Sequence, residues 1–130
     1  METIKVIVDW LENYGTVSDS IPGCVATHQT FLGIQEVYVS AVDFHLEGLE
    51  VDEIPACLSG QYSFEFKLST RALLHRLDGL LTHAAIARET GINEKQLQHY
   101  MTGFRTARPD KRDKIINSIH HIGQELLDVV

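Results

Sequence analysis

The spacing of apolar residues changes along this chain, and that change limits its possible folds more than any other feature. In residues 4–10 and 62–68 apolar side chains occupy every second position, which is the pattern of half-buried strands. In residues 31–45, and again after residue 69, they recur every three or four positions, as in helices that bury one face. We therefore expect an α+β fold in which a small sheet with one helix is followed by helices alone.

Turn residues add two strands to the first half of the chain. A turn at residues 12–13, and a second at residues 19–23 where proline precedes glycine, predict strands over residues 14–18 and 24–26. Residues 49–60 contain a proline and lack periodicity, so they are expected to form a loop. The predicted order of elements is βββαβ.

The second half carries the residue types that start and stop helices. Ser69, Thr82 and Asn93 each precede an amphipathic segment and are expected to be N-caps, and Pro109 suits the first turn of a last, long helix. Two short helices joined by a glycine-containing turn, as expected here, form the pattern of a helix-turn-helix. We predict an all-α domain over residues 69–130.

Charge divides the chain at the same point as periodicity. Residues 1–68 carry a net charge of -9, whereas residues 69–130 carry +2. An acidic module repels nucleic acid and attracts basic proteins, whereas the second module tolerates a phosphate backbone.

Cys24 and Cys57 lie far apart and form no metal-binding motif, and no apolar segment is long enough to span a membrane. We expect a cytoplasmic protein of two domains, residues 1–68 and 69–130.

Several motifs of the first half have a recognisable order. They are Tyr14, Ile-Pro-Gly-Cys-Val-Ala at residues 21–26, Thr30, Ala41, and His-Leu-Glu-Gly-Leu at residues 45–49. In this order they resemble the N-terminal domain of HicB-type antitoxins, which has a partial ribonuclease-H-like fold. The resemblance implies that this domain binds a small, basic, HicA-like toxin that cleaves mRNA.

Two positions depart from the HicB pattern. His28 stands where a glycine is usual, and Gly33-Ile34 stands where Glu-Ala is usual. A glycine within a helix costs about 1 kcal/mol relative to alanine. We therefore expect the first turn of this helix to be irregular.

The spacing of Ala87, Gly91 and Leu97 resembles the helix pair of Xre-type phage repressors. The resemblance implies that the helix after Asn93 enters the major groove of operator DNA, while the first residue of the preceding helix contacts a phosphate. Polar residues of the recognition helix suit base edges, and the arginines after it suit the backbone. The alternative is an all-α domain without affinity for DNA. The candidate DNA-binding residues are His83, Lys95, Gln96, Gln98, His99, Arg105 and Arg108.

The last helix carries more apolar surface than one core requires. One stripe, running through residues 115, 119, 122 and 126, completes the domain core, and a second runs alongside it through residues 116, 123 and 127. We expect the second stripe to form a homodimer or higher oligomer, which supplies two half-site readers. The alternative is that both stripes are buried within one chain.

Catalytic, metal and cofactor motifs are not recognisable in the sequence, so we expect no enzyme, no metal site and no cofactor. The ribonuclease-H-like resemblance raises one alternative, a metal-dependent nuclease built from several carboxylates. The available carboxylates are those of Asp9, Glu36, Asp43, Glu47 and Glu65.

Taken together, these features predict an antitoxin that neutralises a HicA-like toxin and represses its own operon. The alternative is a stand-alone helix-turn-helix transcriptional regulator whose first domain binds a ligand or mediates oligomerisation.

Overall fold

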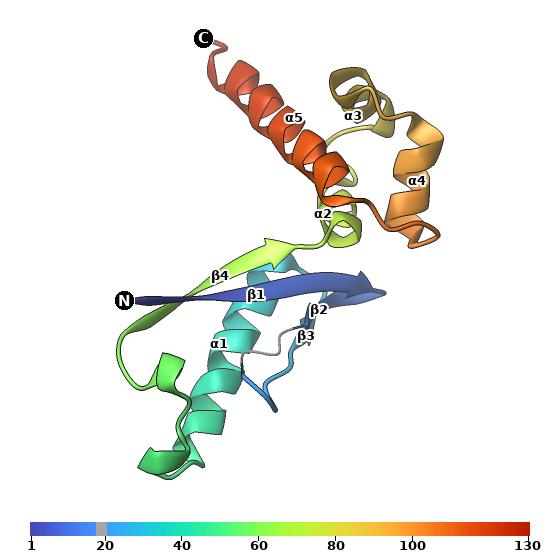
Figure 1. Cartoon of the computed structure of the whole chain (residues 1–130). Coiled ribbons are helices and arrows are strands. Elements are labelled where there is room, and N and C mark those ends of the chain that lie inside the picture. The colour runs from blue at the N-terminus through green and yellow to red at the C-terminus, as the bar shows by residue number, and fades with distance from the viewer. Residues whose placement is uncertain (18–20) are drawn as a thin grey trace. The chain divides into compact units, whose positions relative to one another are not determined.

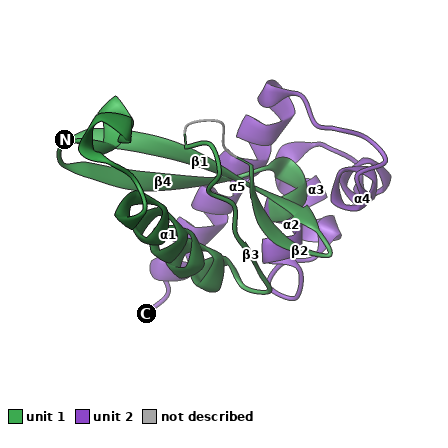
Figure 2. Cartoon of the chain, turned by 90° about the horizontal axis from the view of Figure 1, so that it is seen from below, with its two compact units in different colours: residues 1–72 green, residues 73–130 purple. Residues whose placement is uncertain are grey.

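The chain forms a four-stranded sheet with one long helix, followed by four α-helices (Figure 1). A computed structural model describes residues 1–17 and 21–130. It confirms the α+β class and the order βββαβ. The chain divides into two compact units, residues 1–72 and residues 73–130, coloured separately in Figure 2.

The sheet has the strand order β3-β2-β1-β4. A hairpin with Glu12 at a φ of 67° joins the antiparallel strands β1 and β2, whereas β4 runs parallel to β1 with Glu2 opposite Tyr62 and Val8 opposite Leu68. Parallel pairing requires a long crossover between the two strands, and the intervening segment supplies it with a helix. The strands are β1 (Glu2–Leu11), β2 (Asn13–Val17), β3 (Thr27–His28) and β4 (Tyr62–Leu68).

The third strand lies later in the chain than the sequence predicted. Residues 24–26 are not a strand, and the paired residues are Thr27 and His28. The reason is that the Ala26 N–H donates to the Thr16 hydroxyl at 2.9 Å. In a continued β-ladder it would donate to the backbone carbonyl of Thr16 instead. The predicted proline-glycine turn is present, with Cys24 N–H bonded to the Ile21 carbonyl at 3.2 Å. The parts of the predicted strand and turn at residues 18–20 lie outside the described residues.

Helix α1 (Phe31–Glu47) covers one face of the sheet, as Figures 1 and 2 both show. Ile34, Tyr38 and Val42 point into the sheet and are fully buried. The Tyr38 ring meets the rings of Phe64 and Phe66 edge-on, with centroids 5.4 and 5.9 Å away. Burying each such side chain contributes about 1.5–3 kcal/mol, so this face fixes α1 on the sheet.

The first turn of α1 is regular, and the predicted irregularity is wrong. Thr30 caps the helix by accepting the Gly33 N–H at 3.0 Å. The ring of His28 lies against Gly33, where an added Cβ would overlap it, and its Nδ1 accepts the Thr30 N–H at 3.0 Å. His28 and Gly33, the two departures from the HicB pattern, therefore compensate for each other.

The predicted loop at residues 49–60 contains two short 3₁₀ helices, η1 (Val51–Glu53) and η2 (Ala56–Leu58). Leu58 is buried and anchors this segment to the core of the first unit.

The first unit extends past the predicted boundary at residue 68 into the start of a helix. Ser69 donates its N–H to the Val8 carbonyl at 2.8 Å and its hydroxyl to the Asp9 carboxylate at 2.7 Å. The same hydroxyl accepts the Ala72 N–H at 3.1 Å, which confirms Ser69 as an N-cap. These bonds attach the first turn of the helix to strand β1, so the compact unit ends after Ala72.

The remaining helices begin at the predicted caps. Thr82 and Asn93 accept backbone N–H groups, and Pro109 occupies the first turn of the last helix. Among the described residues, no helix is both long and apolar enough to cross a bilayer. The helices are α2 (Thr70–Leu77), α3 (His83–Thr90), α4 (Glu94–Thr102) and α5 (Pro109–Leu127).

We predict that Gly33→Ala destabilises the protein by about 1–3 kcal/mol, because the new methyl group overlaps the His28 ring. The control is Gly123→Ala in α5, where nothing lies within 4 Å of the added Cβ. That substitution should stabilise the helix by up to about 1 kcal/mol. Urea unfolding monitored by circular dichroism measures both changes. His28→Ala should recover most of the loss in the Gly33→Ala background, and the absence of any recovery would contradict the steric explanation.

Candidate nucleic-acid interface

A three-residue turn joins α3 to α4, and each of its residues has a local role. Gly91 adopts a φ of 77°, which L-residues other than glycine rarely adopt, and its N–H closes α3 on the Ala87 carbonyl at 2.8 Å. Ile92 is buried and anchors the turn. Asn93 then starts α4 by accepting the Gln96 N–H at 2.7 Å. The result is two short helices joined by a glycine-containing turn, as the sequence predicted.

Apolar side chains fix α4 in the second unit. Ile86 of α3, Leu97 of α4 and Ile115 of α5 are each buried, and α3 packs against both neighbouring helices. At the end of α4, the His75 ring lies 3.0 Å from the Met101 carbonyl oxygen. This packing restricts rotation of α4. The polar residues on its opposite side are therefore held in a fixed orientation.

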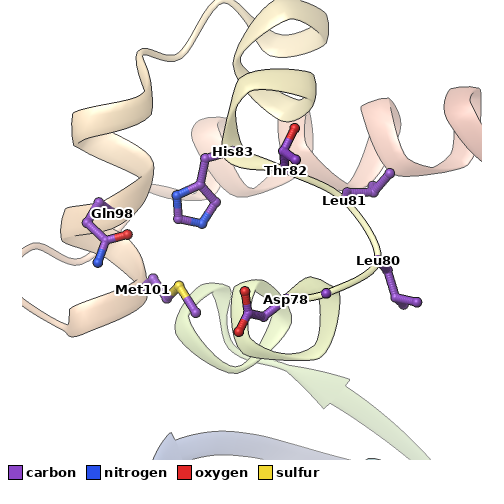
Figure 3. A pocket seen from close by; sticks show the side chains of 8 residues that line it. Asp78, Leu80, Leu81, Thr82, His83, Gln98 and Met101 are labelled. Carbon is purple, nitrogen blue, oxygen red and sulfur yellow. The ribbon is translucent and has the colours of Figure 1, made fainter.

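A cleft of about 550 Å³ lies between α4 and the segment that joins α2 to α3. His83 and Gln98, two predicted contacts from different helices, both line it. Figure 3 shows the His83 ring directed into this space, which the side chains of Gln98, Met101 and Asp78 also border. The structure thus brings together the expected phosphate contact and an expected base contact.

A second hollow, of about 310 Å³, lies along the first turns of α4. Lys95, His99 and Arg105 line it together with Asn93 and Gln96, and no carboxylate is among these lining residues. The cationic side chains of Lys95 and Arg105, with the His99 ring beside them, form a site that suits an anion or the acceptor edge of a guanine.

Gln96 and Arg108, two of the predicted DNA contacts, differ from the others in their surroundings. The Gln96 side-chain amide donates to the Tyr100 hydroxyl one turn later, which restricts its availability to a ligand. Arg108 is exposed and lines neither of these two spaces, and its backbone carbonyl accepts the Arg112 N–H at 3.0 Å.

Phe104 is a surface residue that the sequence interpretation passed over. Its side chain is 71% exposed just after α4, near the His99 ring (centroids 4.8 Å apart) and the Arg105 guanidinium (5.8 Å from the ring centroid). An aromatic residue directly before two spaced arginines was the signal available in the sequence. Asp78 was missed because nothing in its local sequence indicates that it faces α4.

The apolar stripes of α5 are buried at one end only. Ile115 is fully buried, whereas Leu126 and Leu127 are 67% and 79% exposed. Ile119 and Ile122 are half-buried between these ends. The last turns of α5 therefore present apolar surface to solvent.

The carboxylates considered for a nuclease lie on different elements. Asp9 on β1 accepts hydrogen bonds from Ser69 Oγ and Trp10 N, Glu65 is exposed on β4, and the other three lie along α1. Within residues 1–17 and 21–130, no group of three histidine, cysteine or acidic side chains is placed to hold a metal ion.

Cys24 and Cys57 are free, and burial raises the pKa of the Cys24 thiol.

No protein-family model, curated protein or solved structure matches the chain.

We predict that Asn93→Ala lowers the free energy of unfolding by about 1 kcal/mol, because the Gln96 N–H loses its acceptor. Asn93→Asp keeps an acceptor oxygen and should retain most of the stability. Thermal unfolding followed at 222 nm compares the variants, and equal losses in both would contradict the capping role.

Proposed function

We propose that the second unit binds operator DNA, with α4 as the recognition helix. The observation that carries this proposal is the grouping of polar and basic residues along a firmly packed α4. Gln98 lies with His83 in one cleft, and Lys95 lies with His99 and Arg105 around a neighbouring hollow. In this arrangement α4 lies in the major groove, where Gln98 and Lys95 reach base edges.

Contacts to the DNA backbone come from residues that flank α4. His83 begins α3, and N–H groups at the start of a helix favour a phosphate. Arg105 and Arg108 follow α4 and are exposed. The net charge of +2 for residues 69–130 is small for a DNA-binding domain. A dimer that binds two half-sites offsets this weak attraction.

We also propose that the whole chain is an antitoxin of the HicB type. Its first unit then binds a small basic toxin, and this binding controls both the toxin and occupancy of the operator. The support comes from the resemblance of residues 14–49 and from the net charge of -9 on residues 1–68, which attracts a basic partner.

An affinity purification from the native host tests the antitoxin proposal. A tagged chain should recover a small basic protein encoded beside its own gene, identified by mass spectrometry. Expressing that protein alone should arrest growth, and co-expressing this chain should relieve the arrest. Recovery of the chain alone, still bound to its promoter, would instead favour the stand-alone regulator.

Gln98→Ala should weaken binding to the operator more than binding to random DNA, because it removes a base contact. Arg105→Ala should weaken both equally, and should reduce the slope of log K against log salt by about 1. Fluorescence anisotropy with both duplexes, over a series of salt concentrations, measures these effects. Equal losses for both duplexes with Gln98→Ala would contradict its assignment as a base contact.

Replacing Leu126 and Leu127 with Asp should convert a dimer to a monomer, because it places charges on the exposed apolar turns of α5. Operator affinity should then fall at least about tenfold, since the second half-site no longer contributes. Sedimentation velocity and anisotropy measure the two effects. His120→Asp on the same helix is the control for added charge, and a monomeric wild-type chain would contradict the dimer.

A further inference from the structure

The outer face of α1 carries apolar side chains that no other described part of the first unit covers. Ile34, Tyr38 and Val42 account for the side that packs on the sheet. On the other side, Phe44 is 79% exposed and Leu32 is 69% exposed. A large aromatic side chain on the surface of a rigid helix is a common anchor in protein interfaces.

Acidic residues line the same outer face. Glu36, Asp43 and Glu47 are spaced by seven and four residues, so they form one stripe along α1. All three are exposed, and Leu32 and Phe44 lie on opposite sides of the stripe, as their spacing from Glu36 requires. We name the surface formed by Leu32, Glu36, Asp43, Phe44 and Glu47 the α1 outer surface.

The negative charge continues beyond the helix. The segment after α1 adds Glu50, Asp52 and Glu53, which are all exposed, together with the exposed side chain of Val51. No Lys or Arg occurs anywhere between Lys5 and Lys67. The segment that contains α1 therefore supplies no lysine or arginine to neutralise the α1 outer surface.

The face of the sheet that α1 does not cover has a different character. Lys5 stands opposite Glu65, and Ile7 stands opposite Lys67. Acids and bases alternate there, so that face has no strong field of either sign. The α1 outer surface, by contrast, combines exposed apolar area with charge of a single sign.

This combination determines the chemistry of the partner. The same surface of a second copy would bring like charges together, and nucleic acid or an anionic lipid surface would be repelled for the same reason. A basic protein satisfies both features, because its positive charge is attracted by the stripe while an apolar pocket receives Phe44.

We propose that the α1 outer surface is the docking site for a basic protein partner, with Phe44 as its apolar anchor. This inference rests on the proposed function, and it identifies the part of the first unit that meets the toxin. The acidic stripe accelerates encounter and sets its salt dependence, whereas burial of Phe44 slows dissociation.

Site-specific photo-crosslinking in the native host tests the location. Benzoylphenylalanine replaces Phe44 in the full chain, and replaces Leu11, which is 77% exposed on the β1–β2 hairpin, as the matched control. Irradiation should yield an adduct at position 44 and much less at position 11, and mass spectrometry should identify the captured protein as basic. An adduct found mainly at position 11, or an acidic or neutral captured protein, would overturn the proposal.

Binding of the purified basic protein to full-length variants then tests the roles. Phe44→Ser should weaken binding about 10- to 30-fold, chiefly through faster dissociation. The triple variant Glu36→Gln, Asp43→Asn, Glu47→Gln should slow association about tenfold at low salt. The matched control changes the net charge equally at Glu2, Glu12 and Glu65, all to Gln, and should change the association rate far less.

The outcomes separate this inference from the proposed function. If a basic protein copurifies but binds the triple variant and its matched control equally, the docking surface is wrong while the antitoxin proposal stands. If no basic protein associates with the chain at all, the toxin-binding part of the proposed function fails as well. Circular dichroism should show that every variant retains the wild-type spectrum and melting temperature.

Discussion

The parallel pairing of β4 with β1 is the constraint on which the rest of this structure depends. Two parallel strands cannot be joined by a short turn, so the chain must cross from one end of the sheet to the other. Helix α1 makes this crossing and buries Tyr38 against the aromatic rings of β4. The pairing also brings Ser69 to Asp9, where its hydroxyl both closes the end of the sheet and caps α2.

The proposed function rests on how charge is distributed over this framework. Because α1 buries one side, its acidic stripe must face solvent, and residues 1–68 carry almost no base to balance it. The second unit instead suits a negatively charged partner, because Lys95, His99 and Arg105 lie around one hollow beside α4. One chain thus carries one surface whose charge suits a basic protein and another whose charge suits DNA, and the proposed antitoxin role requires both.

Local patterns predicted the elements, whereas contacts between distant residues escaped prediction. Alternation in β1 and β4, and the caps Thr82 and Asn93, depend on neighbours along the chain, so the sequence was sufficient for them. The position of β3 depends on a bond from Ala26 to Thr16, and the regular start of α1 depends on the His28 ring beside Gly33. The sequence offered the candidate DNA-binding residues one by one, but it did not show how they divide between the cleft and the hollow, because packing of α3 against α4 determines that division.

Native mass spectrometry of the chain purified from its host, mixed with a duplex from its own promoter, tests the central claim most directly. We predict an assembly that contains two or more copies of the chain, a small basic protein and the duplex, with a random duplex bound far less at moderate salt. A chain that retains neither the duplex nor any basic protein under these conditions would contradict it.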